Sequence, residues 1–122
     1  MAQHNITGQW GEDLACEILI KKGYTIRERN LRIGHYEIDI IAMKGNRIIF
    51  VEVKTRTNTD SDPLDAIDNK KILRMTRAAN SYITTFDIPQ EPQFDIITII
   101  GNPYDYTTEH IPDAFTAPLT SR

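Results

Sequence analysis

The sequence predicts a single α/β domain in which helices cover a central mixed sheet. The predicted elements are, in chain order, a helix at 6–22, strands at 24–32, 36–43 and 47–56, a helix at about 63–86, a strand at 93–101 and a short strand at 106–111. Helices interleaved in this way with a mixed sheet are typical of an α/β layer fold. Because 122 residues can bury one core, we assign residues 1–122 to one domain, with a C-terminal tail at about 112–122.

Both helix predictions depend on apolar spacing and on end signals. In the first helix Trp10, Leu14 and Ile18 recur at helical spacing. Thr7 is its predicted N-cap, and Gly23 follows two lysines as a stop. The predicted apolar stripe of the second helix consists of Ile72, Met75, Ala79, Ile83 and Phe86.

The first three strands are predicted to form an antiparallel meander. Only short glycine-containing turns, at residues 33–35 and 44–46, separate them. Connections this short join antiparallel strands, because parallel pairing needs a long crossover. The strand at 93–101 follows the second helix and is rich in β-branched residues, but the sequence identifies no partner for its Asp95.

The composition excludes several classes of protein. A single cysteine, Cys16, rules out an internal disulfide framework and a cysteine-rich zinc site, which fits a reducing compartment. No apolar run reaches the roughly 18–20 residues of a membrane helix, and MAQHNITGQW lacks the basic and apolar regions of a signal peptide. We therefore expect a cytoplasmic protein with no membrane partner.

Charge is distributed unevenly along the chain. Residues 1–77 contain thirteen Lys and Arg against eleven Asp and Glu, a balance of +2, whereas residues 78–122 contain one against six, a balance of −5. The net charge of −3 argues against indiscriminate coating of nucleic acid. A polyanion should nevertheless bind to the part of the protein formed by residues 1–77.

The stretch IIFVEVKTR, residues 48–56, places charged residues in an apolar strand. Because side chains alternate between the faces of a strand, Glu52, Lys54 and Arg56 should share one face. Burying an isolated carboxylate or ammonium group is strongly unfavourable. These residues therefore require partners.

The preceding strand offers such partners. Glu37 and Asp39 are predicted to share one face, and the predicted opposite face consists of Ile38, Ile40 and Ala42. The short hairpin can bring Asp39 beside Glu52, where a divalent cation would remove the repulsion between the carboxylates. Lys54 could then orient water and stabilise the transition state of phosphodiester hydrolysis.

Less specific interpretations fit the same residues. Glu52 and Lys54 would also suit a half-exposed strand whose surface ion pairs contribute little. Glu12 has small neighbours that would let a backbone or a metal approach, yet a glutamate in a first helical turn also suits the helix dipole. The neighbours are Gly8, Gly11, Ala15 and Cys16.

A basic stripe on the second helix is the main candidate for contacts to nucleic acid. Lys70, Arg74 and Arg77 lie on one side of that helix. Such a stripe is typical of a solvated face, but it could also follow a phosphate backbone. The same alternatives apply to the basic strand residues Arg27, Arg29, Arg32 and Arg56.

Five sequence motifs occur in order between residue 8 and about residue 99. They are the Gly8-x-x-Gly11-Glu12 helix start, Arg29-Asn30, Glu37-Ile38-Asp39, Phe50 to Arg56, and Phe94-Asp95, with the single residue Lys70 of the second helix before the last of them. In these motifs the chain resembles the YraN family, also called UPF0102, and more distantly the archaeal Holliday-junction resolvases. Both belong to the restriction-endonuclease-like superfamily with the PD-(D/E)xK signature. The resemblance implies that superfamily's three-layer fold.

The resemblance also implies roles for individual residues. Asp39 and Glu52 would bind Mg²⁺, or alternatively Mn²⁺, with the Val53 carbonyl and Glu12 as further ligands. Lys54 would be the catalytic lysine. Glu37 could hydrogen-bond to the metal ligands without binding the ion, could itself be a ligand, or could be a charge at the strand edge. Ile38 replaces the proline of the superfamily signature, and Tyr36 stands where the family has a glycine.

The function implied by the resemblance is metal-dependent hydrolysis of DNA, with branched or otherwise structured DNA as the expected substrate. A homodimer with two-fold symmetry would suit a symmetric junction. A non-catalytic nucleic-acid-binding or interaction module with the same fold is the alternative. The residues also leave an RNA-directed activity open.

Overall fold

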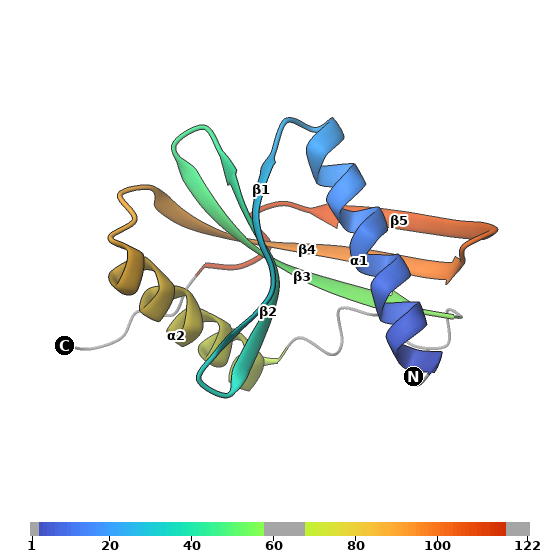
Figure 1. Cartoon of the computed structure of the whole chain (residues 1–122), viewed down its shortest axis with the longest axis horizontal. Coiled ribbons are helices and arrows are strands. Elements are labelled where there is room, and N and C mark those ends of the chain that lie inside the picture. The colour runs from blue at the N-terminus through green and yellow to red at the C-terminus, as the bar shows by residue number, and fades with distance from the viewer. Residues whose placement is uncertain (1–2, 58–67, 117–122) are drawn as a thin grey trace.

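The computed structural model describes residues 3–57 and 68–116, and its side chains from residue 9 onward. Two helices lie on opposite faces of a five-stranded sheet (Figure 1). The elements are α1 (Gln3–Lys21), β1 (Thr25–Ile33), β2 (Tyr36–Lys44), β3 (Arg47–Arg56), α2 (Asn69–Phe86), β4 (Glu91–Asn102) and β5 (Asp105–Ile111). The predicted α/β three-layer architecture is confirmed. Neither helix of the described residues is long and apolar enough to cross a membrane.

The start of each helix differs from its prediction. α1 already begins at Gln3, so Thr7 lies inside it and is not its N-cap. Local capping signals mark favourable starts, but the preceding residues contain no glycine or proline that would stop the helix. α2 begins at Asn69, where the Asp68 carboxylate accepts a hydrogen bond from the Lys71 backbone N–H (2.9 Å). The predicted start near residue 63 lies outside the described residues.

The strands are arranged in the sheet in chain order, β1-β2-β3-β4-β5. β1, β2 and β3 form the predicted antiparallel meander, and β4 pairs antiparallel with β5. β3 and β4 are parallel, with Glu52 opposite Ile96. Because parallel neighbours need a long connection, α2 crosses between them over one face of the sheet.

Alternation of side chains places the charged end of β3 on the α2 side. Ile49 and Val51 pack against α1, and Phe50 packs against α2, so Glu52 and Lys54 continue the α2 side. The predicted shared face of Ile38, Ile40 and Ala42 in β2 is wrong. Ile38 packs with α2, whereas the other two pack with α1.

The cause of this change lies at Asp39. The β2–β3 ladder runs from Lys44↔Arg47 to Ile40↔Val51. Just beyond it, the Asp39 carboxylate accepts a hydrogen bond from the Val53 backbone N–H (2.8 Å), so a side chain takes the place of a backbone carbonyl. β2 and β3 therefore separate at the point where the charged residues begin.

The buried stripe of α2 is rotated relative to the predicted one. Its buried residues are Met75, Thr76, Ala78, Ala79 and Tyr82. Phe86, predicted to end the stripe, is 52% exposed. Tyr82 points inward instead, and its hydroxyl donates to Glu28 (3.0 Å) and accepts from Arg27 (2.6 Å). Apolar periodicity in the sequence defines the buried side of this helix only to within about one residue.

Asp95 is fully buried on the α1 side of β4 and has four partners. Its Oδ2 lies 3.0 Å from the Tyr24 hydroxyl and 2.8 Å from His110 Nε2. Its Oδ1 accepts from Gln93 Nε2 and the Asp113 backbone N–H, both at 2.9 Å. This network joins the residue before β1, the strands β4 and β5, and the segment after β5 around one carboxylate.

Replacing Asp95 with Ala should lower the free energy of unfolding by about 1–3 kcal/mol, because buried donors would lose their acceptor. Chemical denaturation measures this loss. Glu109→Ala is the matched control, since Glu109 is an exposed acid on β5, and its effect should stay within about 0.5 kcal/mol. Equal losses in the two variants would contradict a structural role for the Asp95 network.

Candidate active site at the separation of β2 and β3

The candidate site lies where β2 and β3 separate under the first turn of α2. Glu52 is 5% exposed and directly follows the buried apolar residues 48–51 of β3. Its Oε2 lies 2.7 Å from Lys71 Nζ and 3.3 Å from Lys54 Nζ, and its Oε1 accepts from the Tyr36 hydroxyl (3.3 Å). Three donors from β2, β3 and α2 thus compensate one buried carboxylate.

Asp39 is the second carboxylate of the site. Burial raises its pKa to about 7, and the negative charge of Glu52 adds to this rise, while the hydrogen bond from Val53 N–H opposes it. Asp39 accepts its hydrogen bond from the residue that follows Glu52, so the two carboxylates lie near each other and repel when both are charged. Such repulsion is what a bound cation would relieve.

The two lysines respond differently to this environment. Burial lowers the pKa of Lys54, and its contact with Lys71 lowers it further. Burial also acts to lower the pKa of Lys71, but the hydrogen bond and charge of Glu52 outweigh it, so that pKa is raised. Lys71 therefore holds its proton firmly beside Glu52, and Lys54 is the lysine that more readily exchanges one.

Tyr36 completes the wall of the site. Burial raises the pKa of its hydroxyl, and the charges of Glu52 and Asp39 raise it further. The hydroxyl consequently keeps its proton and acts as a donor to Glu52. The Tyr36 side chain therefore takes part in the site.

Glu12 of α1 lies toward β1. Its Oε1 is 3.8 Å from Arg29 Nη2, and the same guanidinium contacts Asp13 at 2.7 Å. Burial raises the pKa of Glu12, whereas a hydrogen bond with Asn30 and the charge of Arg29 oppose that rise. Asn30 has a left-handed backbone (φ 53°), which accounts for an Arg-Asn motif within a strand.

The donor set fits a hard cation only in part. Across residues 3–57 and 68–116, no group of three or more His, Cys, Asp or Glu could hold a metal ion. Asp39, Glu52 and the Val53 carbonyl would supply three oxygen donors, a set that suits Mg²⁺ because this ion retains several waters. Glu12 influences the pKa of Asp39, but its role as a ligand stays a prediction, as does the supporting role of the exposed Glu37.

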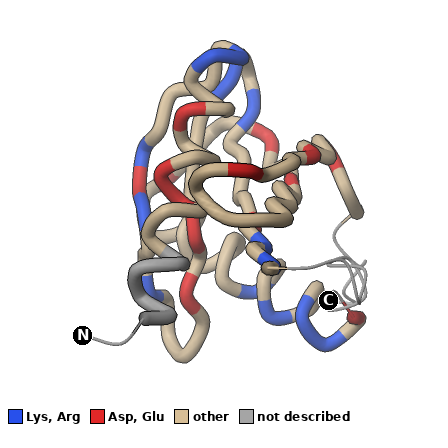
Figure 2. Tube along the Cα trace, turned by 90° about the vertical axis from the view of Figure 1, so that its right-hand side faces the viewer, with Lys and Arg blue, Asp and Glu red and all other residues tan. Residues whose placement is uncertain are grey.

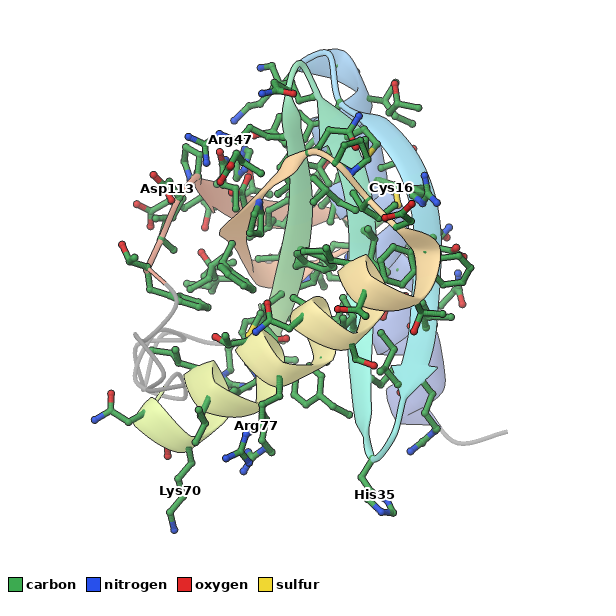
Figure 3. All side chains as sticks on the ribbon, turned by 90° about the vertical axis from the view of Figure 1, so that its left-hand side faces the viewer. Cys16, His35, Arg47, Lys70, Arg77 and Asp113 are labelled. Carbon is green, nitrogen blue, oxygen red and sulfur yellow. The ribbon has the colours of Figure 1, made fainter. Side chains whose placement is uncertain are left out.

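Sequence reasoning missed Lys71 and named its neighbour Lys70. Lys70 is exposed and points away from the sheet (Figure 3). Lys71 lies one turn before the buried Met75, so it faces the sheet together with the buried stripe. A stripe drawn through Met75, Ala78 and Tyr82 would have identified it from the sequence.

The basic residues predicted to bind nucleic acid occupy different environments. Lys and Arg occur at separate places along the Cα trace (Figure 2). Arg27 contacts Tyr82, and Arg29 contacts Asp13 and Glu12. Arg74 and Arg77 are exposed on α2 beside the β1–β2 turn, while Arg32 is exposed and Arg56 half-buried on their strands. Binding of nucleic acid by these residues stays a prediction.

Comparison with known proteins identifies similar chains along almost the whole length. Residues 11–99 match the model of a family described as "Uncharacterised protein family UPF0102". A UPF0102 protein of Bacteroides fragilis is 48% identical over 120 residues, covering 98% of this chain and 99% of its own. UPF0102 proteins of Bacteroides thetaiotaomicron and Phocaeicola vulgatus are 48% and 44% identical, with the same coverage of both chains.

Proposed function

The chain belongs to the UPF0102 family, and from its site geometry we propose that it is a metal-dependent endonuclease that hydrolyses DNA phosphodiesters. The observation that carries the proposal is the grouping of Asp39, Glu52 and Lys54 where β2 and β3 separate. The α/β layers are consistent with a restriction-endonuclease-like fold. Fold alone does not specify activity, so the proposal depends on the site.

Asp39, Glu52 and the Val53 carbonyl would hold Mg²⁺ or Mn²⁺. When bound, the ion would polarise the phosphate and lower the pKa of a coordinated water. Lys54 would orient the attacking water and stabilise charge that develops on the phosphate. Lys71 would hold Glu52 in place, because its Nζ lies 2.7 Å from Oε2. The 5′-phosphate product is proposed by analogy with the superfamily.

One observation favours the alternative of a non-catalytic binding or interaction module. Two lysines already neutralise Glu52 within the protein. A carboxylate paired in this way can serve as part of a buried ion-pair network that specifies the fold. In that case the site would bind no metal and the protein would cleave nothing.

A cleavage assay distinguishes the two functions. Purified protein is incubated with labelled duplex, single-stranded, flap and four-way-junction DNA and with matched RNA, in Mg²⁺, in Mn²⁺ and in chelator. Nuclease function predicts metal-dependent cleavage of at least one DNA substrate. Absence of cleavage with retained, salt-sensitive binding would favour the binding module.

A further inference from the structure

A surface pocket of about 370 Å³ lies between the β1–β2 turn and the exposed side of α2. Ile33, Tyr36 and Ala78 give it an apolar and aromatic lining, and Arg74 and Arg77 contribute two guanidinium groups. Figure 3 places Arg77 on α2 and His35 at the hairpin tip, both directed toward the same end of the molecule. The volume lies within the range of small-ligand sites.

The pocket adjoins the candidate active site through one side chain. Tyr36 lines the pocket, and its hydroxyl donates to Glu52 Oε1 (3.3 Å). Arg74 also acts electrostatically on Tyr36. A group bound in the pocket would therefore contact the same tyrosine that donates to the carboxylate proposed to hold the cation.

The lining indicates the chemistry of the ligand. Nucleobases stack on aromatic rings and on guanidinium planes, and guanidinium groups also bind phosphate in a bidentate manner. A base paired within a duplex remains stacked and cannot enter a pocket of this kind. An apolar side chain of a partner protein would fill the lining but would leave Arg74 and Arg77 without an anion.

We propose that this pocket binds one unpaired nucleotide of the DNA, with its base against Tyr36 and its phosphate at Arg74 and Arg77. The proposal rests on the proposed nuclease function and names its substrate class. The protein would select DNA that has an unpaired nucleotide beside the cleaved bond, as in a bulge, a flap or the centre of a junction. Continuous duplex would bind only through its backbone.

The test measures binding in chelator, where no cleavage occurs. The probe is a duplex with one unpaired 2-aminopurine, compared with the same duplex in which that base is paired. Wild type should bind the bulged probe about tenfold more tightly, the scale of one base–aromatic stacking contact, and should change the 2-aminopurine fluorescence. Equal affinity for the two probes, or no binding to either, would overturn the proposal.

Ser81→Leu and Asn80→Leu form a matched pair for the same assay. Both residues are exposed on α2, but only Ser81 lines the pocket. Ser81→Leu should reduce affinity for the bulged probe to that for the paired probe, and Asn80→Leu should keep the wild-type preference. If Ser81→Leu keeps the wild-type preference, the pocket is not the site that binds the unpaired nucleotide.

The binding assay and the cleavage assay test the pocket and the nuclease function independently. If the protein prefers the bulged probe but cleaves no substrate, the proposed nucleotide pocket is supported and the proposed nuclease function is contradicted. If the protein cleaves DNA in a metal-dependent way but shows no such preference, the nuclease function is supported and the nucleotide pocket is contradicted. An apolar protein ligand predicts the absence of any preference between the DNA probes.

Discussion

Lys54→Met is expected to lower the single-turnover cleavage rate by about 10²–10³-fold, the scale observed when a preorganised charge-stabilising group is lost. The side chain of Lys54 is largely buried, and Met retains most of its apolar stem. Glu52 keeps its closer partner, because Lys71 Nζ lies at 2.7 Å. The substitution therefore removes the reactive amine without leaving the carboxylate unpaired, and the fold should persist.

Two variants identify the source of that loss. Lys44→Met makes the same change of charge at an exposed residue at the far end of β2 and should cleave like wild type. Glu52→Gln should lose activity through weaker metal binding, measured by calorimetry, with partial recovery in added Mn²⁺. Cleavage by Lys54→Met at the wild-type rate would assign the activity to another site.

Features governed by local rules could be predicted from the sequence. The meander follows from two short glycine-containing turns, and the common face of Glu52 and Lys54 follows from strand alternation. Each of these rules uses only a few neighbouring residues. For that reason both the architecture and the strand carrying the candidate site were accessible without coordinates.

Features set by packing between distant elements could not be predicted. The separation of β2 and β3 at Asp39 places Ile38 and Ile40 on opposite faces, which alternation alone does not allow. The rotation of α2 decides that Lys71, and not Lys70, reaches Glu52. No spacing in the sequence links His110 to Asp95, fifteen residues away, yet its side chain is buried against that carboxylate.

Asp39 should make the metal-free protein less stable as pH rises. Its pKa is raised to about 7 from the ordinary value of 3.8, so the folded state holds the proton more tightly than the unfolded state does. The resulting stabilisation is complete below about pH 4 and is lost as pH rises through about 7. A difference of about three pKa units corresponds to at most about 4 kcal/mol.

Asp39→Asn separates this effect from other titrations, because Asn can still accept the hydrogen bond from Val53 N–H but has no charge to titrate. In chelator, wild type should lose stability relative to Asp39→Asn between pH 4 and pH 8, measured by denaturant unfolding at each pH. Mg²⁺ at the upper pH should restore stability to wild type, since binding to the folded state alone shifts the unfolding equilibrium, and should do little for Asp39→Asn. Parallel pH profiles in chelator would mean that folding does not raise the pKa of Asp39. Parallel profiles combined with no response to Mg²⁺ would also remove Asp39 from the proposed metal site.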